Sequence, residues 1–164
     1  MLRFDNVTRT YGSRVAVDRL NLHVDRGELF ALLGHNGAGK TTTIKMLVGL
    51  LRPSSGAIYV GPYNVVDNPR EVSRLIGYVP DLPFLYDKLS GREFLRFVAD
   101  MYGMTDAAAT EAVARETDRF QLKDFLDQLT ESYSHGMRQR TVVAAALLHQ
   151  PELLVVDEPM VGLD

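Results

Sequence analysis

A glycine-rich segment carries the clearest chemical signal in this sequence. Residues 34–42 read GHNGAGKTT and fit the pattern G-x-x-x-x-G-K-[ST] of a phosphate-binding loop. Its three glycines let the backbone turn tightly and bring successive N–H groups toward one anion. Lys40 can reach the β- and γ-phosphates, and the Thr41 hydroxyl can ligate Mg²⁺. We therefore predict a nucleoside triphosphate site formed by Gly34, Asn36, Gly37, Ala38, Gly39, Lys40, Thr41 and Thr42.

The flanking residues place this loop between a strand and a helix. Residues 29–33 are a short, unbroken apolar run, which is typical of a buried parallel strand. After the loop, Ile44, Leu47, Val48 and Leu51 recur at helical spacing. A helix that begins near the last glycine would add the positive end of its dipole to the phosphate site.

Two carboxylates follow another apolar run, residues 153–156. Ligands of α/β folds bind beyond the carboxyl ends of the strands, so Asp157 and Glu158 are predicted to point toward the phosphates. Asp157 would hold the Mg²⁺ that Thr41 also ligates, whereas Glu158 would orient the attacking water or accept its proton. The sequence thus predicts phosphate, metal and water-activating groups at one site.

The rest of the chain alternates between strand and helix patterns. Residues 2–7 and 20–24 alternate apolar and polar side chains, as half-buried antiparallel strands do, and short strands are expected at 57–60 and 75–79. From Ser90 onward the period becomes helical. These patterns indicate an α/β fold.

The helical part begins with a capping box formed by Ser90 and Glu93. A second, alanine-rich helix is expected at residues 107–120 and a short third one at 122–129. The polar loop 130–137 then opens into a helix whose apolar residues are Val142, Val143, Ala146 and Leu147. We expect these helices to form a subdomain inserted into the sheet.

Composition excludes several classes of site. The net charge of −3 gives no general attraction to nucleic acid, and with no cysteine the chain forms neither disulfides nor thiolate metal sites. The four histidines show no metal-ligand spacing. The longest strictly apolar run, residues 142–148, is far too short to span a membrane.

Taken together, these motifs resemble the ATP-binding-cassette (ABC) ATPases over the whole chain. Residues 133–137, YSHGM, resemble the family signature Leu-Ser-Gly-Gly-Gln and keep its serine, Ser134, and its second glycine, Gly136. Residues 162–164 match the D-loop. Tyr11 lies where the family stacks an aromatic ring on adenine, although a partly buried structural tyrosine is the ordinary alternative.

The resemblance implies a P-loop NTPase core sheet with an N-terminal antiparallel β part and an inserted helical subdomain. Residues 1–164 would be one nucleotide-binding domain, with 1–80 and 151–164 as the ATP-binding core and about 88–150 as the helical signature subdomain. The family's C-terminal strands and switch histidine would follow Asp164, so the domain is expected to be incomplete. Their absence would expose the backbone edge at residues 29–33.

Two further departures from the family concern contacts. Asp81 stands at the position of the Q-loop glutamine, where a carboxylate can still bind Mg²⁺ directly or through water. His135 and Met137 replace a glycine and the glutamine of the signature, which would weaken contacts to a partner's nucleotide. Ser134 itself suits either a γ-phosphate contact or a simple helix N-cap, because both use the same geometry.

By resemblance, the expected function is ATP binding and hydrolysis with Mg²⁺, which powers a membrane exporter through ATP-driven dimerisation. Residues 82–93 resemble the multidrug and ABC-2-type exporter branch. The implied partners are a second ABC ATPase subunit and a transmembrane permease at the cytoplasmic face of the cell membrane, with no nucleic acid. Two alternatives stay open: a nucleotide-binding fragment without turnover, and a non-transport ABC ATPase. A GTPase is disfavoured because the sequence has no Asn-Lys-x-Asp motif.

Overall fold

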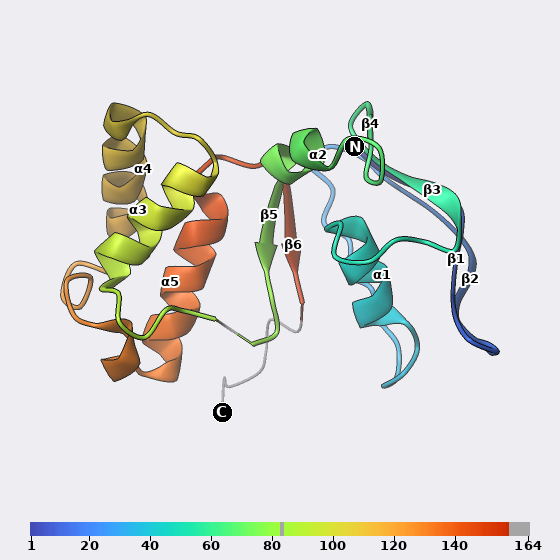
Figure 1. Cartoon of the computed structure of the whole chain (residues 1–164), viewed down its shortest axis with the longest axis horizontal. Helices are drawn as coiled ribbons and strands as arrows, with labels where there is room; N and C mark the ends of the chain where they lie inside the picture. The colour runs from blue at the N-terminus through green and yellow to red at the C-terminus, as the bar shows by residue number, and fades with distance from the viewer. Residues whose placement is uncertain (83, 158–164) are drawn as a thin grey trace. The chain divides into compact units, whose positions relative to one another are not determined.

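Four strands in the N-terminal half form one antiparallel sheet, and the strands predicted at residues 2–7, 20–24 and 57–60 are confirmed. The computed structural model, which describes residues 1–82 and 84–157, gives the strand order β2-β1-β3-β4 (Figure 1). These strands are β1 (Leu2–Tyr11), β2 (Arg14–Val24), β3 (Ser55–Val60) and β4 (Tyr63–Asn64). Alternate side chains on one face of the sheet form its core, including Leu2, Phe4, Val7, Val24, Ile58 and Val60.

The pairing of β1 with β2 contains a bulge that matters for the site. Thr10 pairs with Val15 and Arg9 pairs with Val17, so Ala16 is an extra residue in β2. An extra residue bends a strand and redirects its backbone groups. The bulge lies next to the helix that follows the glycine-rich loop.

That helix, α1 (Lys40–Leu47), begins where the sequence places it and packs against β2. Its buried side chains are those of Thr43, Met46 and Leu47, whereas Ile44 is only partly buried. Residues 48–54 then lead into β3. A second helix, α2 (Pro69–Leu75), packs on β4. Helix α1 is thus fixed to the sheet near the start of β2.

The prediction of a strand at residues 29–33 is wrong. The segment forms no strand, and Leu29 and Leu33 are 98% and 88% exposed. A strand exists through hydrogen bonds to a neighbouring strand, and none of the described strands pairs with this segment. An apolar run indicates that its side chains favour burial, but it does not show that another strand is available to pair with it.

The C-terminal half contains a two-stranded sheet and three packed helices. The strands are β5 (Ile76–Val79) and β6 (Leu153–Val156), whose arrows point the same way in Figure 1. The helices α3 (Gly91–Met101), α4 (Asp106–Arg119) and α5 (His135–Leu147) all contact one another. Their shared core is built mainly from Phe94, Leu95, Ala112, Val113, Leu122, Phe125, Leu126, Val142, Ala145 and Leu148. The helices expected at 90–102, 107–120 and after 137 are therefore confirmed.

The prediction of a short helix at residues 122–129 is wrong, because this segment is a series of turns. The buried residues Leu122, Phe125 and Leu126 do have helical spacing. However, the Phe125 carbonyl accepts a hydrogen bond from the Tyr133 hydroxyl at 2.9 Å, and the Leu126 carbonyl accepts one from the Arg92 N–H at 2.9 Å. The Leu126 carbonyl is thus bonded to α3, and the Phe125 carbonyl accepts from Tyr133 as well as from the Gln128 N–H at 3.0 Å.

A buried carboxylate ties α4 to the end of α5. Glu116 is 1% exposed and forms an ion pair with Arg115, whose Nε lies 2.7 Å from Glu116 Oε1. The same guanidinium donates to the Leu148 carbonyl at 3.0 Å. The buried Glu116 thus holds the Arg115 guanidinium, and the hydrogen bond from Arg115 to Leu148 links α4 to the end of α5.

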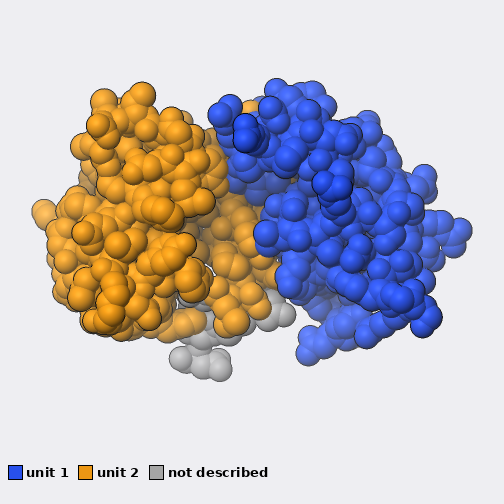
Figure 2. Space-filling view, viewed as in Figure 1, with its two compact units in different colours: residues 1–76 blue, residues 77–164 orange. Residues whose placement is uncertain are grey.

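These elements divide into two compact units, Met1–Ile76 and Gly77–Asp164 (Figure 2). The first unit holds the four-stranded sheet, α1 and α2, and the second holds the three-helix cluster and β6. Within residues 1–82 and 84–157, no helix is both long enough and apolar enough to cross a membrane.

The capping box at the start of α3 is confirmed and gives a test of helix stability. The Ser90 hydroxyl accepts from the Glu93 N–H at 3.2 Å, and the Glu93 carboxylate accepts from the Ser90 N–H at 2.8 Å. The carboxylate also accepts from the Ser90 hydroxyl at 2.9 Å, and its bonds to the Ser90 backbone and, second, to this hydroxyl lower the pKa of Glu93. A lowered folded-state pKa stabilises the fold when the carboxyl is ionised and ceases to do so as acid protonates it.

We predict that Ser90→Ala lowers the free energy of unfolding by about 1 kcal/mol at neutral pH. The loss should shrink in acid, since protonated Glu93 no longer completes the box. Thr105→Ala is the matched control, because Thr105 caps α4 through a single bond to the Ala108 N–H at 3.3 Å. Urea unfolding followed by circular dichroism measures both losses. An equal, pH-independent loss in the two variants would show that the Glu93 carboxylate adds nothing.

Candidate functional site

The glycine-rich loop folds into a compact turn that opens α1. Gly37 and Gly39 have φ angles of +82° and +88°, values that residues with a Cβ rarely adopt. The Ala38 N–H donates to the His35 carbonyl at 3.1 Å, and the Thr43 N–H donates to the Gly39 carbonyl at 2.8 Å. Gly39 is the N-cap of α1. The amide groups that begin a helix without internal partners therefore lie at the end of this loop.

Packing as well as conformation requires glycine at position 39. A Cβ at Gly39 would collide with the carbonyl oxygen of Ala16 and lie 3.2 Å from a methyl group of Val17. Ala16 is the extra residue of the β2 bulge. The loop thus rests directly on the backbone of β2, which fixes its position relative to the sheet.

Lys40 closes the loop with its own side chain. Its Nζ donates to the carbonyl of Gly34 at 2.5 Å and to that of His35 at 3.0 Å. The first turn of α1 contains no acidic residue. An ammonium group, free helix-start amides and the positive dipole end are therefore gathered in one loop, and each of them favours an anion. Thr41 is exposed and Thr42 partly buried in the same turn.

The hairpin between β1 and β2 brings an arginine, Arg14, beside this loop. Tyr11 pairs with Arg14 across a two-residue turn, and the Tyr11 side chain is 47% exposed. The terminal nitrogen of Arg14 lies 3.6 Å from where a Cβ of Gly37 would be. The sequence reasoning missed Arg14. Its position three residues after Tyr11, directly after the turn, was the available signal.

Two further predicted residues, Asp81 and Asp157, belong to the second unit. The Asp157 N–H donates to the Val79 carbonyl at 2.9 Å, which places Asp157 at the end of β6 beside the end of β5. Asp157 is buried, and Asp81 lies two residues beyond Val79. Burial, followed by the negative charges of Asp157 and Asp81, raises the pKa of the Tyr78 hydroxyl. The two carboxylates therefore share the carboxyl end of this sheet.

These carboxylates do not form a metal site by themselves. In the described part of the chain, no three His, Asp or Glu side chains are grouped so as to hold a metal ion. Mg²⁺ commonly uses only one or two protein carboxylates together with substrate phosphates and water, so this donor set fits Mg²⁺ bound to a nucleotide. Thr41 and Asp157 lie in different units, and their common Mg²⁺ site stays a prediction. Glu158 and the D-loop residues 162–164 lie outside the described residues.

Ser134 and Gly136 lie at the start of α5. The Ser134 hydroxyl accepts from the Met137 N–H at 3.3 Å, so the structure shows it as the N-cap. Both residues are exposed, and a Cβ at Gly136 would meet no atom within 4 Å. Behind them, the buried Tyr133 packs its ring edge-on against Phe125 at 5.1 Å. The packing of Tyr133 on Phe125 thus holds the exposed start of α5 in place. Its contact with a nucleotide stays a prediction.

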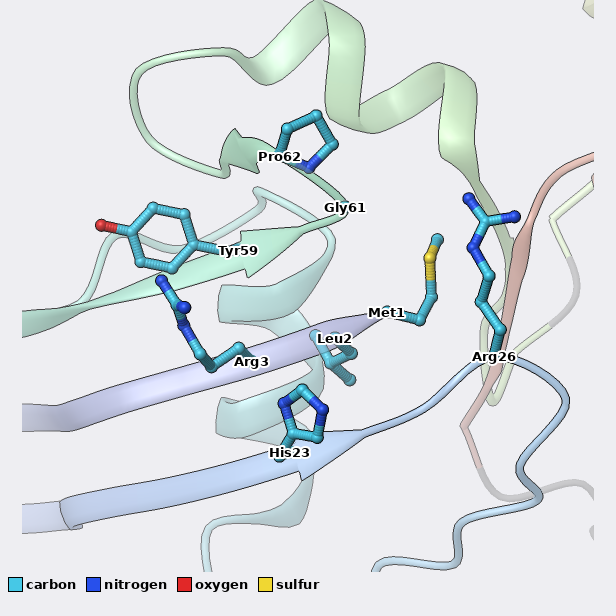
Figure 3. Close-up of a pocket in the computed structure, with 8 residues that line it drawn as sticks. All are labelled: Met1, Leu2, Arg3, His23, Arg26, Tyr59, Gly61 and Pro62. Atoms are coloured by element: carbon cyan, nitrogen blue, oxygen red, sulfur yellow. The ribbon is translucent and has the colours of Figure 1, made fainter.

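A separate cavity of about 410 Å³ lies at one end of the four-stranded sheet (Figure 3). Arg3 lies over the Tyr59 ring at 4.5 Å and is paired with Asp5 at 3.1 Å. His23 is paired with Asp25 at 3.0 Å. Arg3 and His23 thus already have carboxylate partners, whereas the glycine-rich loop combines an ammonium group with the start of a helix. Its full lining is Met1, Leu2, Arg3, His23, Arg26, Tyr59, Gly61 and Pro62.

Comparison with known proteins identifies the family. Residues 17–161 match the ABC transporter family, a region that includes the glycine-rich loop, the α5 start and Asp157. The chain belongs to the ABC transporter family. The resemblance inferred from the sequence motifs is therefore confirmed, as is the α/β fold class.

Curated members of the family match the chain along nearly all of its length. It is 41% identical over 164 residues to the bacitracin transport ATP-binding protein BcrA of Bacillus licheniformis, covering 100% of this chain and 53% of that protein. It is 40% identical to the linearmycin resistance ATP-binding protein LnrL of Bacillus subtilis over 164 residues, with the same two coverages. The chain thus spans about half the length of the curated relatives it matches.

Solved structures of ABC proteins share this fold. An ATP-binding subunit of an ABC transporter, 36% identical, superposes with a TM-score of 0.90 over 99% of this chain and 68% of that one. The ATP-binding cassette MJ0796, solved as a dimer in a post-hydrolysis state with ADP and phosphate, is 25% identical with a TM-score of 0.86. That match covers 100% of this chain and 76% of MJ0796.

The contact between Gly39 and Ala16 predicts a specific defect in this ABC protein. Gly39→Ala should reduce the binding of inorganic tripolyphosphate by about tenfold or more, because loop or strand must shift and positioned amides tolerate little displacement. Gly49→Ala is the control, since Gly49 has a φ of +78° but its Cβ would come no closer than 4.0 Å to Val65. Isothermal titration calorimetry measures both affinities. Equal losses would mean that left-handed strain, rather than the contact with β2, limits position 39.

Proposed function

We propose that this chain is the nucleotide-binding part of an ABC transporter ATPase that binds ATP with Mg²⁺. The observation that carries the proposal is the assembly within the first unit. The β1–β2 hairpin brings Arg14 beside the loop, Tyr11 is paired with Arg14 across the turn, and the bulge at Ala16 supports Gly39. The first unit thereby carries an aromatic ring proposed for the base (Tyr11), a cationic side chain (Arg14) and the phosphate loop. Gly34, Asn36, Gly37, Ala38, Gly39, Lys40, Thr41 and Thr42 would surround the phosphates.

The roles of the acidic residues follow from their chemistry. Thr41 and Asp157 would hold Mg²⁺, which neutralises phosphate charge during transfer, and Asp81 would bind the metal directly or through water. Glu158 would orient the attacking water and accept its proton. Asp81 and Asp157 share one end of the β5–β6 sheet, which supports a common role for them.

We propose in addition that the active unit is a dimer of ATPase subunits. Ser134 and Gly136 would contact the γ-phosphate of a nucleotide bound to the partner through a hydroxyl, an amide and the dipole of α5. Their exposure at a helix start without acidic residues in its first turn supports this role. The family member MJ0796 is known as a dimer with ADP and phosphate.

A permease is the second proposed partner. The Phe84, Tyr86 and Phe97 side chains are exposed, and their rings meet edge to face at 5.3 and 5.5 Å. An exposed aromatic group of this kind is typical of a protein-binding surface. We propose that it contacts a transmembrane permease of an exporter, which would hold the ATPase at the cytoplasmic face of the membrane.

The exposed leucines before the phosphate loop differ in character from this aromatic group. Leu29 and Leu33 belong to a segment with no described strand partner, and their sequence pattern indicates a preference for burial. Rings that already meet edge to face, as those of Phe84, Tyr86 and Phe97 do, form a preorganised surface, which reduces the entropy lost when a partner binds. We therefore assign the aromatic group, and not the leucines, to the proposed permease contact.

Lys40 tests the nucleotide site. We expect Lys40→Ala to weaken MgATP binding by about 10- to 100-fold, since a charge-assisted hydrogen bond to phosphate is lost. Lys45→Ala removes an exposed lysine from the last turn of the same helix and should bind normally. Calorimetric titration with MgATP compares the variants with the wild type. If Lys40→Ala and the wild type bind equally, the phosphate loop is not the nucleotide site.

Nucleotide binding without turnover is the alternative that one structural observation favours. Residues 29–33, directly before the phosphate loop, have no strand partner in the described structure, and Leu29 and Leu33 are almost fully exposed. A support of this kind is less rigid, and an exposed apolar segment favours self-association.

We therefore predict that the 164-residue chain binds MgATP weakly and hydrolyses it at or near background. A chain extended to the length of its relatives should bind more tightly and turn over. Steady-state phosphate release, calorimetry and solution mass are measured on both. A short chain that is monomeric and hydrolyses ATP as fast as the extended one would contradict this prediction.

A further inference from the structure

Tyr11 is covered on one side by an arginine of its own strand. The guanidinium carbon of Arg9 lies 4.7 Å from the centre of the Tyr11 ring. Residues two apart in a strand project from the same face, so β1 itself brings these side chains together. A cation placed over an aromatic face is attracted by the ring's π electrons. One face of the Tyr11 ring is therefore occupied by Arg9, while 47% of the residue remains exposed.

Arg9 is in turn held by the segment that follows α1. Its Nη1 donates to the Arg52 carbonyl at 3.1 Å. Nearby, the Ser54 N–H donates to the Thr8 carbonyl at 2.8 Å, and the Thr10 N–H donates to the Ser54 hydroxyl at 3.1 Å. The end of β1 is thereby joined to the chain just beyond the helix that begins with Lys40. Arg9 thus links the Tyr11 ring to the segment that follows α1.

The Arg9 guanidinium has one buried donor that makes no hydrogen bond within the described part of the chain. Its Nε is buried and has no hydrogen-bond partner in the described structure. A buried donor without an acceptor destabilises a fold, and such groups often mark a functional position. The hydrogen bond to the Arg52 carbonyl and the contact with the Tyr11 ring therefore hold the guanidinium in place although its Nε has no partner among the described residues.

We propose that Arg9 is a positioning residue for the nucleobase. It holds the Tyr11 ring in a fixed orientation and closes one of its faces, so that the base stacks on the opposite face. The cation also withdraws π-electron density from that open face, which favours an electron-rich purine. This inference rests on the proposed function, which assigns Tyr11 to the base of ATP.

The test compares a ligand that has a base with one that lacks it. Dissociation constants for MgATP and for inorganic tripolyphosphate are measured by calorimetry. We expect Arg9→Gln to weaken ATP binding about two- to fivefold, the range for an exposed cation–π contact, and to leave tripolyphosphate binding unchanged. Arg9→Lys keeps the cation. The loss in log Kd for ATP should therefore be no more than half of the loss caused by Arg9→Gln.

Arg3 provides a matched control on the same strand. Its guanidinium lies 4.5 Å from the Tyr59 ring, and Tyr59 is not part of the proposed site. Arg3→Gln should therefore alter the affinity for neither ligand. Thermal unfolding of every variant, followed by circular dichroism, checks that the fold is retained.

The outcomes separate this inference from the proposed function. If Tyr11→Ala weakens ATP binding selectively but Arg9→Gln does not, Arg9 has no positioning role and the nucleotide site stands. If Arg9→Gln weakens ATP and tripolyphosphate in parallel, Arg9 only supports the hairpin, and the inference is overturned. If Tyr11→Ala leaves the ratio of the two affinities unchanged, Tyr11 does not bind the base, and the inference is wrong. A wild-type chain that binds neither ligand would overturn the proposed function as well.

Discussion

The close approach of Gly39 to the backbone of Ala16 is the constraint on which the candidate site depends. A Cβ at position 39 would overlap the Ala16 carbonyl oxygen, and the left-handed φ of Gly39 starts α1 in the required direction. The bulge in β2 provides the carbonyl against which the loop packs. Since β2 also carries Arg14 and pairs with the strand that bears Tyr11, this contact relates the proposed base-binding residue to the glycine-rich loop.

In the second unit, glycines also allow close contacts near both ends of α5. A Cβ at Gly77 in β5 would collide with the Ala146 carbonyl oxygen and lie 2.8 Å from Pro151, which brings the strand tightly against the end of α5. A Cβ at Gly91 would collide with the Tyr133 hydroxyl. Tyr133 immediately precedes Ser134, so the signature segment is held from the first turn of α3. The lack of a side chain at Gly77 and Gly91 thus allows the close packing that positions α5.

The sequence by itself determined the features that depend on neighbours along the chain. The loop glycines, the capping box of Ser90 and Glu93, the N-cap at Ser134 and the alternation in β1 follow from local dihedral preferences and hydrogen bonds within a few residues. The family motifs have the same local origin, which is why residue types and their spacing were enough to predict the ABC family and the α/β class.

Only the tertiary structure decided the features that depend on distant partners. Residues 29–33 have the composition of a strand but find no strand beside them, and residues 122–129 have helical spacing but give their carbonyls to Tyr133 and Arg92. The approach of Arg14 to Gly37 and the hydrogen bond of Arg9 to the Arg52 carbonyl likewise depend on segments that are distant in the sequence. Hydrophobic periodicity records which side chains favour burial, whereas the hydrogen-bond partner of a backbone group is set by whichever segment the fold brings next to it.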